Sequence, residues 1–439
     1  MKTVWSLRLV PVMALGLGVG GAQAAGFQLL EQNASGIGNS YAGSAAIAEN
    51  ASTIYYNPAG MTRLPGLNVS GGLVGIRPSF KFDDNGSTGP GGLPLGTNNG
   101  GDAGSLGLVP NAYMSWEVNP SWFVGLGIGA PFGLMTEYDE GWIGRYHSKK
   151  FKIKSININP SVAYKVNEQL SVGAGINWMR LDANYRRNSP AAGLISQLPG
   201  GMANPLAPTL LGSPDMEAQV KMKGDAWGWN LGLIYQVTPA TRIGLSYRSK
   251  VKINASGDTN IDNTTPVPIP VHFDANATVE LPDTAIFSVV HDLNSKWQLL
   301  ADISWTGWSS IQSLEIDNGN PAFNDKLDLR FRDTWRVALG ANYRLNHQWT
   351  LKGGVAWDQS PVDSSKYRPT SLPDNDRYWV SIGAQYNFND RTTIDIGYAH
   401  LFLSNTSIDN DTDAASKGTV RGDYSSNANM VGLQVSHRF

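Results

Sequence analysis

Hydrophobic and polar residues alternate along most of this chain, with the period of two that belongs to a β-strand. In three clear examples, residues 297–305, 335–343 and 349–357, one face of the predicted strand is apolar and the other is mostly polar. Aromatic residues stand at both ends of each apolar row, which is typical of the interfacial girdles around a transmembrane barrel. A soluble β-sandwich also alternates, but the length of these strands and their aromatic ends favour a barrel.

The last residues of the chain repeat this pattern. Val431, Leu433, Val435, His437 and Phe439 alternate with small or polar residues, and the chain ends on an aromatic side chain. Such an ending is similar to the signal that outer-membrane barrels present to their assembly machinery. We therefore expect that machinery to be a partner through Phe439, and His437 to lie at the membrane interface.

Turn residues predict the number of strands. Six short breaks carry Asn or Pro, at residues 118–121, 165–169, 237–240, 292–296, 344–348 and 387–390. Seven longer polar or Gly/Pro-rich stretches alternate with them, at residues 83–107, 131–150, 187–215, 257–274, 317–325, 359–374 and 405–419. Short turns at one end and long loops at the other are the usual asymmetry of outer-membrane barrels. Seven loops that each join two strands predict 14 strands, unless one long stretch hides a hairpin.

The first residues predict an exported protein. Lys2 and Arg8 precede an apolar run at residues 9–20, and Ala22-Gln23-Ala24 follows as a small-x-small cleavage site. We expect residues 1–24 to be a signal peptide, because the run is shorter than the about 20 residues of a membrane anchor. No later apolar stretch has the length of a transmembrane helix, so a membrane span must be a closed barrel.

Residues 25–65 do not alternate, and they are rich in small residues at 34–38 and 42–48. A segment upstream of the first strand with no alternating face either hangs in the periplasm or folds back into the lumen. We expect a hatch, because a 14-strand lumen would leak unless it were filled. The predicted fold is an all-β, 14-stranded antiparallel outer-membrane barrel at residues 66–439 with a hatch at residues 25–65.

Composition changes this picture only in what it excludes. Charged residues are 16% of the 439, and 49 residues are Gly, whereas soluble domains have about 25% charged residues and about 7% Gly. A net charge of -2 argues against a nucleic-acid partner. The absence of Cys excludes disulfides, thiolate metal sites and cysteine nucleophiles.

No pattern for catalysis or for a cofactor stands out. The six histidines are scattered without zinc-ligand spacing, and the pair Gly36 and Gly38 lacks the third Gly of a dinucleotide loop. A Ser–His esterase is the alternative, since both residue types occur, but no nucleophile-elbow pattern supports it. We therefore predict no metal, no cofactor and no enzymatic activity.

Several segments carry a resemblance to a known family. They are residues 25–29, 35–38, 41–43, the turn Asn57-Pro58-Ala59, and residues 335–340, 358–362 and 372–379. Together they resemble the FadL-type outer-membrane transporters of long-chain fatty acids or aromatic hydrocarbons. The resemblance implies a 14-stranded barrel in the bacterial outer membrane, with Asn57, Pro58 and Ala59 in its hatch. It also implies passive uptake of a hydrophobic ligand, with Phe27 as an apolar contact.

Transport of an apolar ligand requires a capture surface outside the membrane. The stretch 131–146 carries apolar side chains where a porin would carry charges, and Phe132, Leu134 and Trp142 are our candidates for capture. The family's loop groove is similar. The alternative is a loop that packs on itself, since large aromatic side chains in loops usually bury something.

A fatty acid carboxylate in the lumen should meet a cation. Arg336 and Lys352 have the inward parity, opposite to Trp335 and Val337, and Arg332 lies in a Phe-Arg-Asp segment where the family also has a basic residue. These three cations are the candidate partners of the carboxylate. The alternative is a lattice of ion pairs with the inward-facing Asp302, Asp358 and Asp395.

A ligand that avoids water must leave through the wall. In the third predicted strand the inward positions Gly125, Gly127 and Gly129 have no side chain, and the next strand carries Pro160, which cannot donate to the ladder. We therefore expect a lateral gate between strands three and four. The alternative is that the glycines make room for the hatch.

The sequence leaves other functions open. A general diffusion porin and a surface adhesin would use the same barrel, and an aromatic hydrocarbon is an alternative substrate to a fatty acid. Outer-membrane lipids and lipopolysaccharide are expected to surround the barrel, which we expect to be a monomer.

Overall fold

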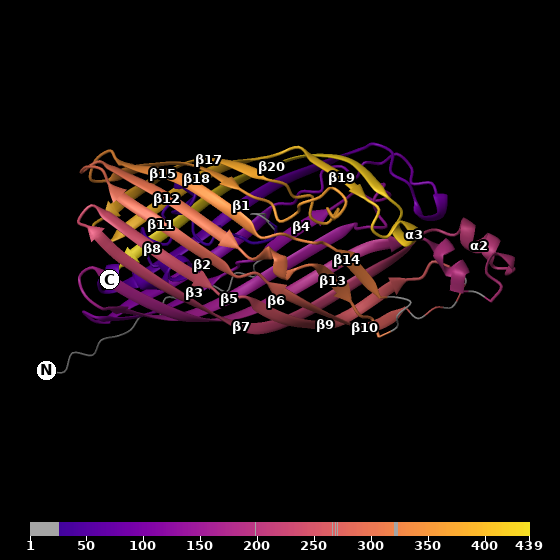
Figure 1. The fold of residues 1–439 in the computed structure, drawn as a ribbon, viewed down its shortest axis with the longest axis horizontal. Coiled ribbons are helices and arrows are strands. Elements are labelled where there is room, and N and C mark those ends of the chain that lie inside the picture. Colours follow the sequence, from indigo (N-terminus) through magenta and orange to yellow (C-terminus); the bar gives the residue numbers. More distant parts are fainter. Residues whose placement is uncertain (1–25, 198, 266, 268, 270, 320–323) are drawn as a thin grey trace.

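The computed structural model describes residues 26–197, 199–265, 267, 269, 271–319 and 324–439, so the expected signal peptide lies outside the described residues. The chain forms a closed antiparallel barrel of 14 strands, as the turn residues predicted (Figure 1). Strand β20 pairs with β1 along 17 residue pairs and closes the barrel. In barrel order the strands are β1 (Leu67–Asp84), β2 (Gly107–Asn119), β3 (Trp122–Gly129), β5 (Lys150–Lys165), β6 (Leu170–Ser189), β7 (Met216–Thr238), β8 (Thr241–Arg248), β11 (Thr284–Asp292), β12 (Trp297–Thr306), β15 (Thr334–Arg344), β16 (Trp349–Asp358), β17 (Arg377–Asn389), β18 (Thr392–Leu403) and β20 (Val420–Arg438).

Six tight turns lie at one end of the barrel and seven long loops at the other, as the sequence predicted. Four further strands extend the wall on the loop side: β4 (Gly133–Glu137), β9 (Val251–Asp262), β10 (His272–Leu281) and β19 (Thr406–Asn410). Several predicted loops were therefore too long. Outside the membrane the outward face of a strand meets water and carries polar residues, so the alternation that predicts a transmembrane strand is lost there.

One predicted loop was too short, because a hairpin lies inside it. Strands β13 (Ser313–Ile316) and β14 (Asp325–Asp328) pair with each other, and Asp317, directly after β13, exchanges two backbone hydrogen bonds with Asn276 of β10. Leu314 and Leu327 face one side of this hairpin, and Glu315 and Lys326 form an ion pair of 2.7 Å on the other. Four residues per strand are too few for a visible alternation in the sequence.

The outward face of the barrel carries the apolar rows that the sequence predicted. Leu299, Val337, Leu351 and Leu433 are exposed there, although each would be buried in a soluble protein. The aromatic side chains at the turn end form ring pairs across neighbouring strands: Trp122 with Tyr164, Trp297 with Tyr343, and Trp349 with Tyr386. At the loop end the girdle continues through Trp178, Trp227, Trp305, Trp335 and Tyr378.

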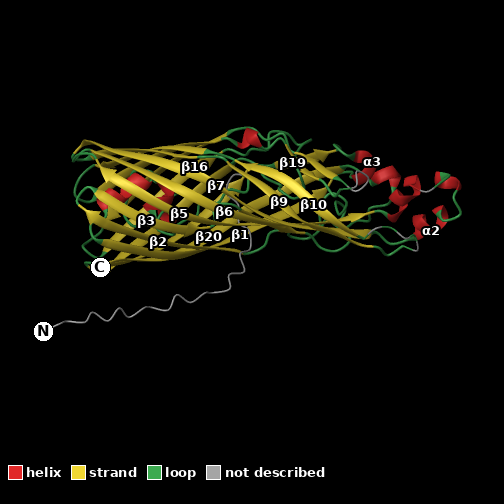
Figure 2. Ribbon diagram, turned by 90° about the horizontal axis from the view of Figure 1, so that it is seen from below, coloured by secondary structure: helices red, strands yellow, loops and turns green. Residues whose placement is uncertain are grey.

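The segment before β1 lies inside the barrel toward the turn end, where Figure 2 shows its short helices within the wall. We call residues 26–65 the hatch; it contains η1 (Ile37–Asn39), α1 (Thr53–Tyr56) and η2 (Pro58–Arg63). Inward-facing glycines bring the wall close to it. A Cβ at Gly232 would lie 1.9 Å from Asn57 Oδ1, and one at Gly244 would lie 2.0 Å from the Ala45 carbonyl oxygen. The high Gly content therefore serves the packing of the hatch against the wall.

The remaining helices are short and lie in the outer loops. They are η3 (Pro90–Gly92), η4 (Ala191–Gln197), η5 (Gly201–Ala203), α2 (Ala207–Gly212), η6 (Trp308–Ser310) and α3 (Ala414–Lys417). None of the helices in the described residues is long and apolar enough to span a membrane.

Candidate functional site

An apolar cavity lies above the hatch, between the upper barrel wall and the outer loops. Apolar side chains of β5, β6, β7, β9 and β10 form its sides. The apolar face of the β13–β14 hairpin covers it with Leu314, Ile316, Leu327 and Leu329. No charged side chain is among the 21 residues that line it. Such a lining favours an apolar ligand over water or ions.

Phe27 of the hatch lies at the inner end of this cavity. Its ring centroid is 4.9 Å from that of Trp308 and 5.9 Å from that of Phe132, and Trp308 also contacts Phe331 at 6.0 Å. Leu134 lines the cavity beside them. The structure thus brings three of the predicted contact residues, Phe27, Phe132 and Leu134, to one place.

The start of the hatch is held by a buried carboxylate just beyond Phe27. The Gly26 amide donates to Asp374 Oδ2 at 2.9 Å, and the Ser360 hydroxyl donates to the same oxygen at 2.9 Å. Asp374 also forms a buried ion pair with Arg377, whose Nε lies 3.1 Å from Asp374 Oδ1. Both residues are in the segment 372–379 that carries the family resemblance, but no role was predicted for either of them.

Three hydrogen-bond donors near this anchor lack an acceptor among the described residues. They are Arg377 Nη1, Arg336 Nε and Trp379 Nε1, all buried. The Arg336 guanidinium lies over the Trp379 ring at 5.0 Å, and the pairing of β15, β16 and β17 places Arg336 and Arg377 on either side of Asp358. Buried donors without an acceptor are costly, and the fully buried carboxylate of Glu31, whose two oxygens also have no partner among the described residues, belongs to the same cluster as Arg336 and Arg377.

The hatch is fastened to the wall by polar side chains. Lys352 Nζ donates to the Ser35 carbonyl at 3.0 Å and forms ion pairs with Glu49 at 2.9 Å and Asp395 at 3.0 Å. Arg336 donates to the Ser40 carbonyl at 2.7 Å. Neither cation lines the apolar cavity. Lys352 therefore fits the predicted alternative, a lattice of ion pairs. Arg336 differs, because its Nε has no acceptor among the described residues.

The turn Asn57-Pro58-Ala59 fastens the hatch at a second place. The Asn57 side-chain amide donates to the Ala45 carbonyl at 2.6 Å and to the carbonyl of Leu233 in β7 at 3.0 Å, while its oxygen accepts from the Ala59 amide at 3.1 Å. Pro58 begins η2 and has no N–H to lose. One amide side chain thus caps a helix and binds the wall.

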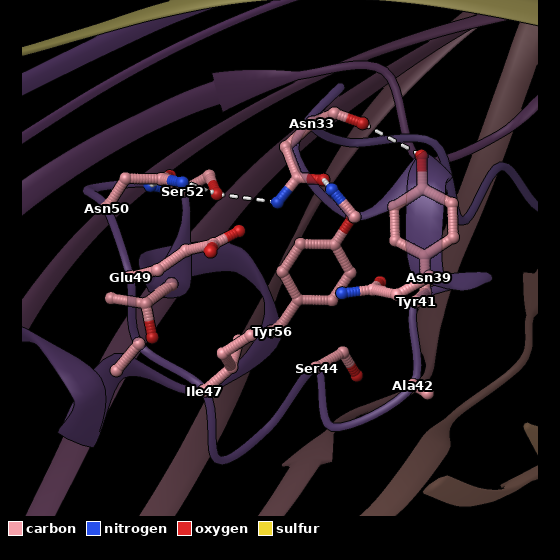
Figure 3. A pocket seen from close by; sticks show the side chains of 13 residues that line it. Asn33, Asn39, Tyr41, Ala42, Ser44, Ile47, Glu49, Asn50, Ser52 and Tyr56 are labelled. Atoms are coloured by element: carbon pink, nitrogen blue, oxygen red, sulfur yellow. Dashed lines mark hydrogen bonds between the residues drawn. The ribbon is translucent and has the colours of Figure 1, made fainter. Parts of the chain in front are cut away.

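A small pocket inside the hatch has a different character from the apolar cavity. Polar side chains line it, among them Asn33, Glu49 and Asn50, beside the rings of Tyr41 and Tyr56 (Figure 3). Asn33 donates to the Ser52 hydroxyl at 2.7 Å. The apolar side chains of Ala42, Ile47 and Ala48 also line this pocket.

The barrel wall is interrupted beside Phe27, on one edge of β3. The β2–β3 ladder stops at the pair Ala112 and Ile128, whereas β2 continues toward the loops and pairs only with β1 there. Residues 130–132 bend away between β3 and β4. The hatch binds this bend, because Gln32 donates to the Ala130 carbonyl at 2.9 Å and accepts from its amide at 3.0 Å.

This position corrects the predicted gate. The pairing of β3 with β5 is unbroken from Trp122 to Gly129, so the wall has no interruption between strands three and four. Gly125 and Gly127 face Ile54 of the hatch, and their missing side chains make room for it, as the alternative proposed. Pro160 interrupts the pairing of β5 with β6 instead, where the Asn159 side chain donates to the Ile176 carbonyl at 2.9 Å.

The predicted capture surface at residues 131–146 was wrong. Trp142 is fully buried and stacks on Tyr138 with centroids 3.8 Å apart, so this loop packs on itself. Phe132 and Leu134 are also buried, toward the cavity. Arg332 is likewise not at the cavity: its side chain is 38% exposed and pairs with Asp363.

A wide groove lies in the outer loops instead. Leu194, Met202 and Leu211 of the loop after β6 line it together with Met216 of β7 and Ile261 of β9. It borders the cavity along β7: Met216 and Ala218 line the groove, and the next inward residues, Val220 and Met222, line the cavity. Periodicity could not show this groove, because Leu194, Met202 and Leu211 come from an irregular loop.

Comparisons with known proteins agree with this architecture. The family described as "Outer membrane protein transport protein (OMPP1/FadL/TodX)" matches residues 17–439. The chain belongs to this family. Outer membrane protein P1 of Haemophilus influenzae is 33% identical, with 97% of this chain and 98% of the relative covered. A long-chain fatty acid transport protein of Escherichia coli O6:H1 is also 33% identical, with 87% of each chain covered.

Solved structures of FadL-family proteins share the fold. A FadL homologue of Pseudomonas aeruginosa superimposes with a TM-score of 0.84 at 26% identity, over 94% of this chain and all of that one. The toluene transporter TbuX of Ralstonia pickettii reaches 0.64 at 21% identity, over 93% and 99% of the two chains, which shows the fold alone. This FadL-family chain is therefore an outer-membrane transport protein.

Proposed function

We propose that this chain takes up hydrophobic molecules across the outer membrane by passive diffusion, without catalysis, and that long-chain fatty acids are its main substrate. The observation that carries the proposal is the apolar cavity, which has no charged lining residue and ends on Phe27 of the hatch. A diffusion porin would need a polar open lumen at this place. The relatives named as fatty acid transport proteins support the substrate class.

The ligand enters from the outer groove. Its exposed apolar side chains, such as Met202 and Leu211, offer a surface for capture, and Met216 to Met222 of β7 lead inward. Burial of apolar surface gains about 25 cal/mol of free energy per Å², and this gain favours movement of an acyl chain from the groove into the cavity.

The three free donors favour a carboxylate over a hydrocarbon. Arg377, Arg336 and Trp379 each hold a buried N–H group without an acceptor among the described residues, and Arg377 belongs to the anchor of the hatch. A carboxylate accepts several hydrogen bonds from cationic donors, whereas toluene accepts none of comparable strength. Of the predicted cations, Arg336 therefore stays a candidate for the headgroup, and Arg377 joins it.

The ligand leaves through the interruption beside β3 and not through the hatch. The pocket within the hatch carries the polar side chains of Asn33, Glu49 and Asn50, while the bend at residues 130–132 adjoins Phe27 and the apolar cavity. The same short hatch segment, residues 27–32, contacts both the cavity and the bend. Ligand that displaces Phe27 would release Gln32 from Ala130 and open the wall to the bilayer.

Uptake of labelled oleate and labelled toluene tests the substrate. A strain without its own fatty acid transporter should take up oleate at least ten times faster with this chain than without it, and toluene at a similar rate in both cases. Arg377→Met should lower the apparent affinity for oleate and leave any toluene uptake unchanged. Preferential uptake of toluene would reject the fatty acid assignment.

A substitution at Asn111 tests the exit. Asn111 lies on β2 beside the interruption, buried, with neither amide atom hydrogen-bonded to a described residue. Asn111→Trp should fill the opening and abolish oleate uptake, while Asn111→Ala, which removes the amide without filling the space, should stay within about twofold of the unmodified chain. Unchanged uptake by an assembled Asn111→Trp barrel would place the exit elsewhere.

A further inference from the structure

Four lysines form a cluster on the outer surface of the barrel that the transport path does not use. Lys152 and Lys154 lie on β5, and Lys221 and Lys223 lie on β7. Their neighbours in sequence, such as Met222, are buried toward the lumen, so the four side chains face outward. Figure 1 shows β5, β6 and β7 side by side along the barrel. We call these four residues the outer lysine cluster.

Strand pairing brings the four lysines together. Asp182 of β6 is paired with Lys154 on one side and Lys223 on the other, and Asn184 is paired in the same way with Lys152 and Lys221. Neighbouring strands are about 4.8 Å apart, and alternate residues of one strand are about 7 Å apart. The backbone positions therefore outline a patch of about 10 by 7 Å, which lysine side chains can span.

The outer lysine cluster has an excess of positive charge. None of its four lysines forms an ion pair with another residue in the part of the chain described here. In contrast, Lys150, two residues before Lys152 on β5, pairs with Glu137 at 2.7 Å. The same shallow hollow contains two carboxylates, those of Asp182 and Asp258. Four cations against two carboxylates leave a patch that favours an anion with at least two charges.

The height of the outer lysine cluster matches the headgroups of the outer leaflet. Trp178 and Trp227 are paired in the girdle at the loop end, and the Trp227 residue is 66% exposed. Lys223 lies four residues beyond Trp227, which is about 13 Å along the strand and about 10 Å along the membrane normal for a strand tilted by about 40°. Apolar residues cover the outward face on the membrane side of the girdle, including Ile176 and Leu231.

We propose that the outer lysine cluster is a binding site for the phosphate groups of lipid A, the membrane anchor of lipopolysaccharide. Charge complementarity selects the phosphates, since basic groups at the membrane surface bind anionic lipid headgroups through charge-assisted hydrogen bonds. The apolar surface below the cluster holds the acyl chains of the same molecule. A free anion would use only the cluster, and a neutral lipid only the apolar surface.

Binding of purified lipid A to the full chain in detergent tests this site. The probes are lipid A with both phosphates, enzymatically dephosphorylated lipid A, and inorganic phosphate. The test variant carries Lys152→Gln, Lys154→Gln, Lys221→Gln and Lys223→Gln. The control variant removes four exposed cations at the turn end, through Lys296→Gln, Arg344→Gln, Arg391→Gln and Arg438→Gln.

The intact chain should bind lipid A at least ten times more tightly than dephosphorylated lipid A, and added salt should weaken that preference. The test variant should lose the preference, and the control should keep it within about twofold. Equal binding of both lipids by the intact chain would overturn the proposal without any variant. Phosphate binding at the cluster as tight as lipid A binding would also overturn it, because the site would then be one for free anions.

Discussion

At the residue scale, the inward-facing charges of this barrel hold the hatch in place. The side chains of Lys352 and Asp395 are 2% and 1% exposed, so water cannot stabilise their charges. The ion pairs of Lys352 with Asp395 and with Glu49 stabilise them instead. Loss of one partner from a buried ion pair leaves an uncompensated charge, which costs about 3–5 kcal/mol. These contacts join the hatch to β16 and β18, far from the apolar cavity.

Lys352→Met should therefore loosen the hatch without preventing barrel assembly. We expect faster hydrogen exchange at residues 33–50 and transient increases of conductance in planar bilayers. Lys326→Met is the matched control, because the Lys326–Glu315 pair is 60% and 63% exposed and solvent already stabilises both charges. Exchange rates in Lys352→Met equal to those of the control would show that the lattice does not fasten the hatch.

The sequence predicted which residues face inward but not what they contact. Parity alone placed Arg336, Lys352 and Asp395 in the lumen, and the structure confirms this, because side-chain direction in a strand has a fixed period. The contacts of Lys352 with Glu49 and of Asp374 with Gly26 join segments more than 300 residues apart. No local pattern encodes such pairs, so the anchor of the hatch could not be predicted from the sequence.

At the scale of elements, turn chemistry and alternation were sufficient for the wall but not for its bends. Asn and Pro set the six turns, while the interruption at residues 130–132 depends on hydrogen bonds from Gln32, which replace those of a neighbouring strand. The row of glycines in β3 predicted weak pairing of this strand with β5, whereas the interruption lies on the opposite edge of β3, toward β2. The neighbouring hatch residue Ile54 accounts for Gly125 and Gly127 instead.

Close contact between inward glycines and the hatch predicts a specific mutational effect. Gly232→Val should displace the hatch, since its Cβ would meet Asn57 Oδ1 at 1.9 Å, whereas Gly353→Val has no heavy atom within 4 Å of its Cβ and should be tolerated. Both barrels should keep their heat-modifiable mobility in electrophoresis. Only Gly232→Val should show increased conductance, and the same conductance in both would contradict the packing described for Asn57.

The outer loops are joined by a buried cluster that responds to acid. Burial lowers the pKa of His147 to about 4, and its ring nitrogen Nε2 lies 3.1 Å from the Gly418 carbonyl. Burial alone would raise the pKa of Asp325, but Arg187 and Lys417, at 2.7 and 2.6 Å, hold it below its usual range. Protonation of either group is easier when the loops open, since an open loop returns both to ordinary pKa values.

The closed loops should therefore lose stability as the pH falls. The neutral His147 contributes fully to the stability of the closed loops above its ordinary pKa of about 6.5, and this contribution is lost progressively toward about pH 4. The contribution of the ionised Asp325 to the same stability is lost only below about pH 4. Hydrogen exchange at residues 139–149, corrected for its intrinsic pH dependence, should report the opening. His147→Gln should remove the loss of loop stability that occurs above pH 4. If the pH dependence of hydrogen exchange in this variant were unchanged, His147 would be excluded as the source of that loss.

At the scale of the whole molecule, a wide barrel becomes selective because another part of the same chain fills it. A 14-strand wall encloses more space than its own inward side chains can occupy, and the hatch fills the turn end while the loops cover the other. The low charge content of the sequence follows from this arrangement. Half of each strand faces lipid, and many inward positions are glycines that touch the hatch.

Deletion of residues 27–60 should convert the transporter into an open pore. Without the hatch, the wall residues Lys352 and Arg336 lose their acceptors, the carbonyl oxygens of Ser35 and Ser40, and water and ions replace those acceptors. Planar-bilayer recordings should show a stable conductance that the intact chain lacks, together with loss of saturable oleate uptake, because Phe27 no longer closes the cavity. Heat-modifiable mobility of the deleted barrel is the control for assembly. If an assembled barrel without residues 27–60 conducted no more than the intact one, the loops alone would seal the lumen, and the hatch would have to serve ligand binding only.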